Sequence, residues 1–296
     1  MNISDERSIF GLQGKVAVVT GGGAGIGQAT ARLFAQVGMR VAVAEIDAAR
    51  VLETRRVLEA EGCECLVIEA DVRKGDDALR VIREVERRFG QLDVLVNNVG
   101  DFLGYKSEFV ESTEKEWDAL YGVNLLHILH MSKAAIPLMR KTGGGSIINM
   151  STVEAFRGIP LTVVYFAFKA AITGFTQSLA VELGQYNIRV NAVAPETTNT
   201  AQIVATPRVP PENREYLKRW FPIGRFGEAS DSAGAVLFLA SERLSGWVSG
   251  STIVVDGGAL AAGAWMRLPN DGWTHLPIIV ADGYTPRPDA RASTQE

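Results

Sequence analysis

The stretch Lys15-Val-Ala-Val-Val-Thr20-Gly-Gly-Gly-Ala-Gly-Ile-Gly27 joins a short β-branched run to a cluster of glycines. The run at 15–20 is typical of a buried strand, and residues 28–38 show the apolar spacing of an amphipathic helix that ends at Gly38. Glycines at such a junction let the backbone turn tightly and touch a pyrophosphate at the helix amino terminus. The stretch therefore predicts a strand, a phosphate-binding turn and a helix.

The same alternation of strand and helix continues along the chain. Helices are expected at about 47–61, 75–89, 113–140, 163–186 and 230–241, the long one opened by a capping box of Thr113 and Glu116. Further strands are expected at RVAVAEI (40–46), CLVIEADV (65–72), LDVLVNNVG (92–100), SIINMS (146–151), IRVNAVAP (188–195) and STIVVD (251–256). Strands that are nearly all apolar and alternate with helices imply a parallel sheet covered on both faces. The predicted fold class is α/β: a doubly wound parallel sheet (Rossmann fold) in a three-layer α/β/α single domain.

Three segments lie outside this rhythm. Residues 1–12 are expected to be an N-terminal extension of the 13–258 domain. Residues 197–228 interrupt the last crossover, and a connection of this length is expected to cover a substrate. Residues 259–296 form a C-terminal tail, an ordered arm or a loose end, whose Trp265 and Trp273 favour partial docking.

Composition excludes several classes of protein. With 296 residues, 47% of them apolar, the chain can bury one large core. A formal net charge of −4 gives no reason to bind nucleic acid or an anionic membrane. No stretch approaches the roughly 18 apolar residues of a membrane span, and Asp5 and Glu6 stand where a signal peptide would need an apolar core. A cytoplasmic location is expected.

Glu45 indicates which dinucleotide the glycine turn binds. It ends the second strand, 20 positions after Gly25, where a carboxylate can accept hydrogen bonds from the adenosine ribose hydroxyls. The same carboxylate would repel a 2′-phosphate. Ala24 stands where a loop that binds NADP would usefully carry Arg or Lys. The sequence therefore favours NAD.

Tyr165 and Lys169 are the candidates for proton transfer. Their i, i+4 spacing places both on one face of an expected helix. A phenol, with a reference pKa near 10, is a poor base at neutral pH. A lysine cation beside it is expected to lower that pKa, as is an oxidised nicotinamide. Tyr-x-x-x-Lys alone is common by chance, so its context has to identify it.

Seven further motifs supply that context. They are, in chain order, Thr20-Gly-x-x-x-Gly-x-Gly27, Asp71-Val72, Asn97-Asn98-Val99-Gly100, Asn124, Asn149-Met-Ser-Thr152, Ile188-Arg-Val-Asn-Ala-Val-Ala-Pro195 and Val255-Asp-Gly-Gly258. Together with the Tyr165–Lys169 pair, they resemble the short-chain dehydrogenase/reductase family over about residues 13–258.

The resemblance implies a role for each match. Asp71 and Val72 would contact the adenine ring, and Asn98, Val99 and Gly100 would run beside the adenosine ribose. Pro195 and Thr200 would meet the nicotinamide carboxamide, and Lys169 would hold the nicotinamide ribose. The full set expected to bind NAD is Gly21, Gly23, Ala24, Gly25, Ile26, Gly27, Glu45, Asp71, Val72, Asn98, Val99, Gly100, Tyr165, Lys169, Pro195, Thr198 and Thr200.

The catalytic residues implied in the same way are Asn124, Thr152, Tyr165 and Lys169. Tyr165 would exchange a proton with the substrate oxygen, and Asn124 would keep a kink in its helix and position a water for proton relay. The family's serine, 13 residues before the tyrosine, is replaced here by Thr152, which has the same hydroxyl chemistry. Ser151 beside it is the alternative.

Two more departures concern residues near the reaction. Phe168 replaces the small residue that is common before the lysine, and Glu196 replaces the glycine that usually follows the proline. The resemblance places Asp101, Phe102, Glu154 and Glu196 near the substrate. If these acids face inward unpaired, the substrate should bring hydroxyl or cationic partners; if they lie at the rim, they face solvent.

No metal site is expected. His127 and His130, at i, i+3, lack a third ligand and are more typical of a core or a subunit contact. Cys63 and Cys65 are expected to share one face of a strand as packing residues.

The function predicted is transfer of a hydride between NAD and a secondary alcohol or its ketone, cyclic or aromatic, by a homo-dimer or homo-tetramer. The alternatives are an NADPH-linked 3-oxoacyl reductase and a non-catalytic nucleotide-binding scaffold.

Overall fold

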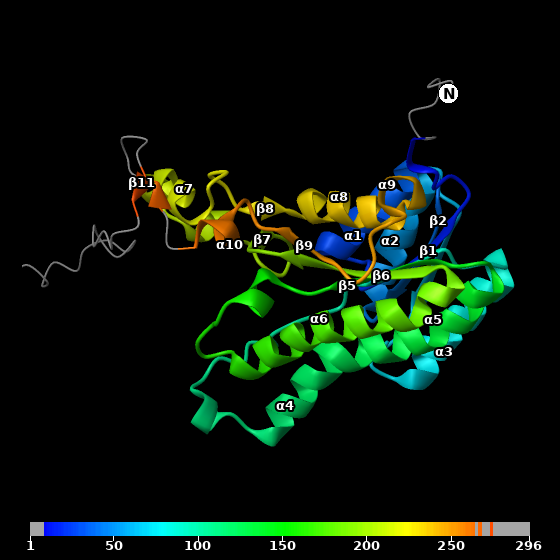
Figure 1. The fold of residues 1–296 in the computed structure, drawn as a ribbon, viewed down its shortest axis with the longest axis horizontal. Coiled ribbons are helices and arrows are strands. Elements are labelled where there is room, and N and C mark those ends of the chain that lie inside the picture. The colour runs from blue at the N-terminus through cyan, green and yellow to red at the C-terminus, as the bar shows by residue number, and fades with distance from the viewer. Residues whose placement is uncertain (1–8, 264–265, 268–272, 275–296) are drawn as a thin grey trace, which may run out of the picture.

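The computed structural model describes residues 9–263, 266–267 and 273–274 and has three layers (Figure 1). All seven strands expected from the sequence pair in one parallel sheet. Its order is β3 (Cys65–Glu69), β2 (Arg40–Glu45), β1 (Val16–Thr20), β4 (Val94–Asn97), β5 (Gly145–Met150), β6 (Ile188–Pro195) and β9 (Thr252–Val255). The predicted fold class is confirmed.

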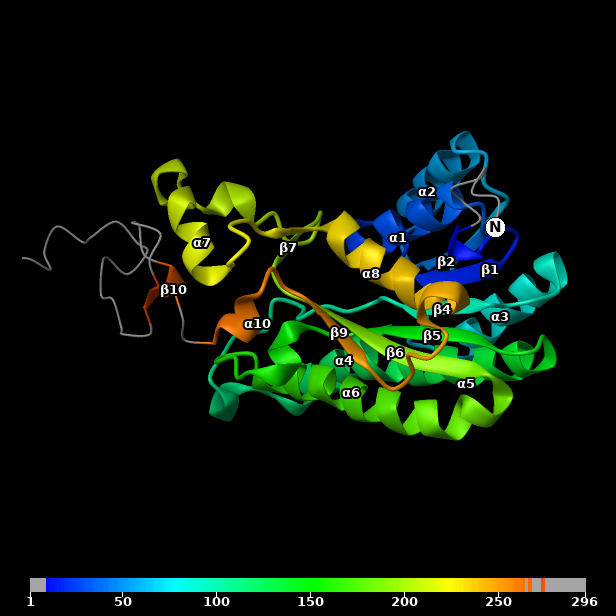
Figure 2. The same cartoon turned by 45° about the horizontal axis from the view of Figure 1, so that its top comes forward.

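Helices cover both faces of this sheet (Figures 1 and 2). One layer holds α1 (Gly25–Gln36), α2 (Ala48–Ala60) and α8 (Ala229–Ala240); the other holds α3 (Gly75–Phe89), α5 (His127–Lys141) and α6 (Val163–Leu183). Alternate residues of β1 enter different cores: Val16 and Val18 one, Ala17 and Val19 the other. Both faces are therefore dry, which explains why the strands are apolar runs rather than alternating patterns.

The helix expected over 113–140 is interrupted. Thr113 caps α4 (Glu114–Tyr121) with the predicted capping box, and the π-helical segment η3 (Gly122–Leu126) then leads directly into α5. A π-helical segment widens the turn locally and often marks a functional site. Asn124 stands at its centre, so the irregularity expected at this residue is present.

The segment 197–228 leaves the carboxyl edge of the sheet. It contains β7 (Thr198–Asn199), the 3-10 helices η6 (Thr206–Arg208) and η7 (Pro211–Tyr216), α7 (Leu217–Trp220) and β8 (Gly227–Glu228), and β7 pairs with β8. Phe221 is buried and packs against Phe226 with ring centroids 5.2 Å apart. Trp220, in the same segment, is 75% exposed.

The described parts of the two chain ends lie outside the seven-stranded sheet. Of the N-terminal extension, Leu12 is buried and the carbonyl of Phe10 accepts a hydrogen bond from Ser241; residues 1–8 lie outside the described part. After α10 (Ala259–Ala262), β10 (Met266–Arg267) pairs antiparallel with β11 (Trp273–Thr274). The rest of the 259–296 tail is outside the described residues. Within the described ranges, no helix is long and apolar enough to cross a membrane.

Candidate active site

The glycine turn after β1 has a backbone that only glycine fits. Gly21 and Gly25 have φ of +62° and +55°, in the left-handed region. A Cβ on Gly27 would lie 2.3 Å from the carbonyl oxygen of Gly21. Helix α1 then begins without a side-chain cap and without an acidic residue in its first turn. The turn therefore leaves an open helix amino terminus that can receive an anion, as a dinucleotide pyrophosphate requires.

Glu45, at the carboxyl end of β2, is buried against this turn. One carboxylate oxygen accepts a hydrogen bond from the amide of Gly23 at 3.0 Å; the other accepts from Ile46 at 2.9 Å and Asp47 at 3.2 Å. A Cβ on Gly23 would lie 2.5 Å from that carboxylate. The carboxylate thus lies at the turn, where it would face the adenosine ribose.

Two arginines that the sequence did not single out stand beside the same turn. Arg32 and Arg50 line an open cleft of about 450 Å³ together with Gly23, Ala24 and Gly25. Arg50 comes from the first turn of α2, and its Cβ is 2.8 Å from where a Cβ of Gly23 would lie. Basic groups are therefore present near Glu45, although none is in the turn itself. Arg32 lies on α1 and Arg50 on α2, and the two meet at the turn because these helices are neighbours in space. The spacing of the two arginines along the sequence does not reveal this.

Two further residues that are expected to bind the cofactor lie at the ends of the next two strands. Asp71 follows β3, and Arg73 holds its carboxylate through bonds of 2.7 and 2.9 Å, which lowers the pKa of Asp71. Asn98 turns away from β4, and its side-chain amide donates to the carbonyls of Thr20 and Gly21 at 3.0 and 3.2 Å. This crosslink ends the strand earlier than the 92–100 run suggested and fixes the loop beside the glycine turn.

Tyr165 and Lys169 lie on one face of α6, as their spacing predicted. The Lys169 ammonium is 5.9 Å from the centroid of the Tyr165 ring and donates to the carbonyl of Met150 at 3.1 Å. Burial lowers the pKa of Lys169 to about 8. A Cβ on Gly100 would approach the ammonium to 2.6 Å, so a larger residue at this position of the β4 loop would displace the Lys169 side chain.

The pKa of Tyr165 departs from the expectation. Burial, followed by the charges of Asp101 and Glu154, raises it to about 12. The net shift is therefore opposite to the one expected, because in the protein chain by itself removal of the phenolate from water and the two nearby acids raise this pKa. Any base function of Tyr165 at neutral pH therefore needs additional positive charge at the site.

Asn124 is held in place from two directions. Its side-chain oxygen accepts from the amide of Asp101 at 3.1 Å, and its amide donates to the carbonyls of Asp101 at 2.7 Å and Leu120 at 3.0 Å. The side-chain amide thus donates to the Leu120 carbonyl inside the helix, at the place where η3 departs from α-helical bonding. The loop after β4 is tied to this helix through Asn124.

The two neighbouring hydroxyls after β5 point in different directions. Ser151 is buried and donates to the carbonyl of Lys169 at 3.0 Å. Thr152 is partly exposed and donates to the carbonyl of Pro195 at 3.2 Å. Both hydroxyls donate to backbone carbonyls, and the difference between them is that Thr152 is partly exposed whereas Ser151 is buried. The arrangement favours Thr152 as the group that meets a substrate oxygen.

Thr198 and Thr200 follow β6 at the same edge of the sheet. Thr198 is buried and donates to the carbonyl of Glu196 at 2.8 Å. A Cβ on Gly25 would lie 3.3 Å from Thr200. The start of segment 197–228 therefore reaches back to the glycine turn.

The acids expected near the substrate are largely paired within the protein. Arg157 donates to Glu154 through two bonds of 3.1 and 2.7 Å and also bonds Glu196. Asp101 accepts from the amide of Leu103 at 2.7 Å. The argument that Glu154 and Glu196 would require a cationic substrate partner therefore does not hold, because Arg157 supplies the cation. The spacing of Glu154 and Arg157, three apart, was a signal that sequence reasoning missed.

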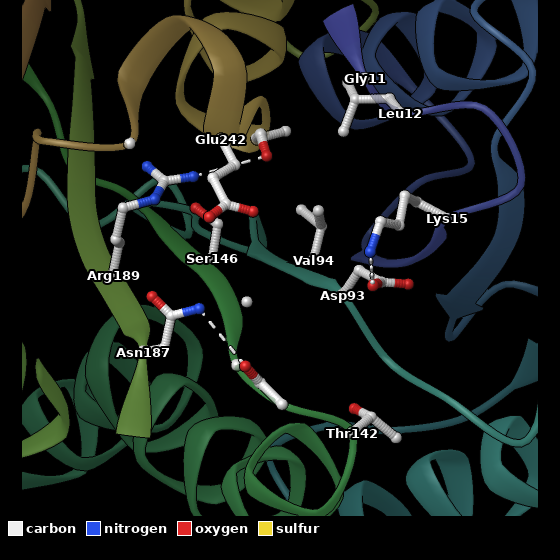
Figure 3. A pocket seen from close by; sticks show the side chains of 15 residues that line it. Gly11, Leu12, Lys15, Asp93, Val94, Thr142, Ser146, Asn187, Arg189 and Glu242 are labelled. Atoms are coloured by element: carbon white, nitrogen blue, oxygen red, sulfur yellow. Dashed lines mark hydrogen bonds and ion pairs between the residues drawn. The ribbon is translucent and has the colours of Figure 1, made fainter. Parts of the chain in front are cut away.

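Another hollow lies at the opposite, amino edge of the sheet (Figure 3). It has a volume of about 100 Å³. Three of its charged groups have partners: Lys15 and Asp93 pair with each other at 2.9 Å, and Arg189 donates to Ser245 at 3.0 Å. None of the candidate catalytic residues lines it, so the chemistry belongs to the carboxyl edge.

His127 and the two cysteines pack inside the protein. His127 is fully buried, and burial lowers its pKa to about 3, so it is neutral. Cys63 and Cys65 both pack against the core shared by α1 and α8. Among the residues described, no cluster of three or more His, Cys, Asp or Glu could hold a metal ion.

Fold and site together define a Rossmann-type oxidoreductase. A family model described as enoyl-(acyl carrier protein) reductase matches residues 21–259. The chain belongs to the short-chain dehydrogenase/reductase family.

Characterised relatives span different substrates. The chain is 39% identical over 249 residues to 3-oxoacyl-(acyl-carrier-protein) reductase of Thermotoga maritima, covering 83% of this chain and 98% of the relative. A 7α-hydroxysteroid dehydrogenase solved with NADH and 7-oxo glycochenodeoxycholic acid has a TM-score of 0.78 at 31% identity, covering 86% of this chain and 97% of that one. Carveol dehydrogenase from Mycobacterium avium, solved with NAD, has a TM-score of 0.77 at 28% identity, covering 84% and 98%.

Proposed function

We propose that this enzyme transfers a hydride between NAD and a secondary alcohol or the matching ketone. The observation that carries the proposal is that Tyr165 and Lys169, on α6, share the carboxyl edge of the sheet with the glycine turn after β1. An acid–base pair and a dinucleotide cradle at one edge are what alcohol oxidation requires.

In the oxidation direction, Tyr165 accepts the hydroxyl proton while Thr152 holds the substrate oxygen. Bound nicotinamide would supply the hydride acceptor and a positive charge. That charge and Lys169 oppose the burial that keeps the Tyr165 pKa near 12. Asn124 ties the β4 loop to η3 and would hold a water through which the proton leaves. In ketone reduction the same groups run in reverse, and Tyr165 donates its proton.

NAD is the proposed cofactor because Glu45 is buried beside the turn. Its carboxylate, bonded to the amide of Gly23 at 3.0 Å, would stand next to the adenosine ribose and repel a 2′-phosphate. The two solved relatives named above contain NADH and NAD, which supports this choice. Arg32 and Arg50 line the same cleft and would reduce the repulsion between Glu45 and a 2′-phosphate. Glu45, however, is the residue that bonds the turn directly.

The proposed substrate is a neutral cyclic or aromatic secondary alcohol of medium size. Phe102 and Phe156 are 37% and 43% exposed beside the candidate substrate residues, so apolar surface is available. Arg157 balances only one of the two glutamates that it bonds, and Asp101 adds a further negative charge. An anionic substrate would meet this excess, and a neutral ring with a polar substituent would not.

A matched series of alcohols tests this substrate class: one ring alcohol, its hydroxylated analogue and its carboxylated analogue, each assayed with NAD. We expect the two neutral compounds to have the higher kcat/KM. If the carboxylated analogue is turned over best, the proposed substrate class is wrong. Glu154→Gln serves as the comparison variant, because an unchanged ranking would show that this acid does not discriminate.

The second candidate function is NADPH-linked reduction of a 3-oxoacyl group. The Thermotoga maritima relative at 39% identity and the position of Arg50 beside Gly23 favour it. Turnover of a 3-oxoacyl thioester with NADPH, at a rate above that of any ring alcohol with NAD, would establish it instead. The third alternative, a non-catalytic scaffold, predicts binding of NADH without turnover of either class.

The homo-oligomeric state and the cytoplasmic location stay predictions from the sequence and from family habit. Light scattering coupled to size-exclusion chromatography measures the first, and a dimer or tetramer is expected. Fractionation of the source cells measures the second.

A further inference from the structure

Arg157 bridges two loops that flank the candidate reaction centre. It belongs to the loop between β5 and α6, just after η4 (Val153–Phe156), and its guanidinium contacts Glu154 in its own loop. The same guanidinium also bonds Glu196, the first residue after β6. The side chains of Glu154 and Glu196 are 18% and 9% exposed, so the two carboxylates that Arg157 bonds are largely shielded from solvent.

A second link between the same loops runs through Thr152. Its hydroxyl donates to the carbonyl of Pro195, immediately before Glu196, and accepts weakly from the amide of Glu154 at 3.4 Å. Glu196 is itself fixed, because it accepts from the amide and the hydroxyl of Thr197 at 2.8 and 3.0 Å. The loop after β5 is therefore bonded to the loop after β6 twice, by Arg157 to Glu196 and by the Thr152 hydroxyl to Pro195.

The charges of this bridge also act on the phenol. Asp101 and Glu154 are the acids whose charges act on Tyr165, and both disfavour its phenolate. Lys169, on the same helix, opposes them from 5.9 Å. Arg157 is partly exposed and contacts Glu154 directly, so it offsets part of the effect of that carboxylate.

We propose that Arg157 is a positioning residue for the reaction: it fixes the Thr152 loop against Glu196 and offsets the Glu154 charge beside Tyr165. This inference rests on the proposed function in its kinetic consequences only. The proposed role also explains Glu196: its carboxylate is the partner that Arg157 bonds on the loop after β6.

The two halves of the Arg157–Glu154 ion pair give the test: removing either one breaks this pair, and Glu154→Gln leaves the contact of Arg157 with Glu196 in place. Arg157→Met leaves Glu154 uncompensated, so the midpoint of the pH profile for alcohol oxidation should rise. Glu154→Gln removes the negative charge and leaves Arg157 in place, so the midpoint should fall. Each shift should be about half a pH unit. The double variant should return close to the midpoint of the wild type.

The loss of positioning is measured separately. Arg157→Met should lower kcat by about tenfold, because the Thr152 hydroxyl is held less firmly. Arg157→Lys restores the charge without the two-point contact, so it should restore the pH midpoint but only part of kcat. The matched control is Arg56→Met in α2, which breaks a bidentate pair with Glu53 at 2.9 and 2.7 Å, also three residues apart. It should change neither the midpoint nor kcat.

A readout without turnover keeps this inference separate from the proposed function. With 13Cζ-labelled tyrosine, the resonance assigned through Tyr165→Phe among the six tyrosines reports the phenolate fraction at one alkaline pH. We expect that fraction to be highest in Glu154→Gln, intermediate in the wild type and lowest in Arg157→Met. If the wild type turns over no alcohol, the proposed function fails, and this order still decides the role of Arg157. Shifts of the same sign in both single variants, or no shift in either, would overturn it.

Discussion

The choice between Thr152 and Ser151 gives a prediction whose size follows from the structure. Thr152→Val keeps the shape of the side chain and deletes the hydroxyl. That hydroxyl makes a 3.2 Å bond to Pro195 at a partly exposed position, so the free energy of unfolding should fall by only about 1 kcal/mol. Turnover should fall much further. Removing one donor from a developing oxyanion costs about 100- to 1,000-fold in kcat.

Ser151→Ala should show the opposite balance. The Ser151 hydroxyl is buried and donates to the carbonyl of Lys169 at 3.0 Å. Its removal should lower the free energy of unfolding by about 1 kcal/mol and leave kcat within a few-fold of the wild type. Thr152→Ser keeps the hydroxyl, so it should retain most of the activity.

The assay is a set of steady-state kinetics at saturating NAD for the wild type and the three variants, paired with urea unfolding of each. Unfolding separates a damaged fold from a missing hydrogen-bond donor. An inactive Ser151→Ala together with an active Thr152→Val would refute the reasoning, because it would place the catalytic hydroxyl one residue earlier.

Three further predictions follow from individual side chains. The enzyme should have at least a tenfold higher kcat/KM with NAD than with NADP, since a carboxylate near a phosphate at an effective dielectric of about 20 repels it by a few kcal/mol. Glu45→Gln should reduce this ratio of kcat/KM values. An unchanged ratio would contradict the role given to Glu45. Burial lowers the pKa of Lys169 from 10.5 to about 8, so the unfolded chain binds the extra proton between these values and stability rises with pH across them. Lys169→Met should therefore raise the free energy of unfolding at pH 7 by up to about 3 kcal/mol and abolish turnover; a less stable variant by urea unfolding would show that the lysine does not destabilise the fold. Alcohol oxidation should speed up from neutral to alkaline pH, because the Tyr165 pKa is raised to about 12; a profile that falls over this range would exclude Tyr165 as the base.

The sheet could be predicted from the sequence because its strands are apolar on both faces and each is followed by a helix. Local patterns were sufficient there. The glycine turn was equally readable, since the positive φ of Gly21 and Gly25 and the close approach at Gly27 require glycine whatever surrounds them. Local patterns were not sufficient at Asn98. Its side chain bonds the carbonyls of Thr20 and Gly21, so β4 ends at Asn97, before the end of the 92–100 run that the sequence suggested.

The electrostatics of the site could not be predicted in the same way. The sequence placed Tyr165 beside Lys169, but it did not reveal that burial and two acids raise the pKa of Tyr165. It placed Glu154 and Glu196 near the substrate without the arginine that pairs them. Desolvation and pairing across 39 residues depend on how the loops after β5 and β6 meet, and no local pattern encodes that meeting.

The central claim is that Tyr165 moves the proton while NAD exchanges the hydride. Formation of NADH from a ring alcohol, followed by absorbance, compares the wild type with Tyr165→Phe, and titration with NADH measures cofactor binding in both. We expect Tyr165→Phe to lose at least about a hundredfold in kcat while it binds NADH nearly as tightly as the wild type. A variant that keeps a near-normal rate would contradict the claim and require another base.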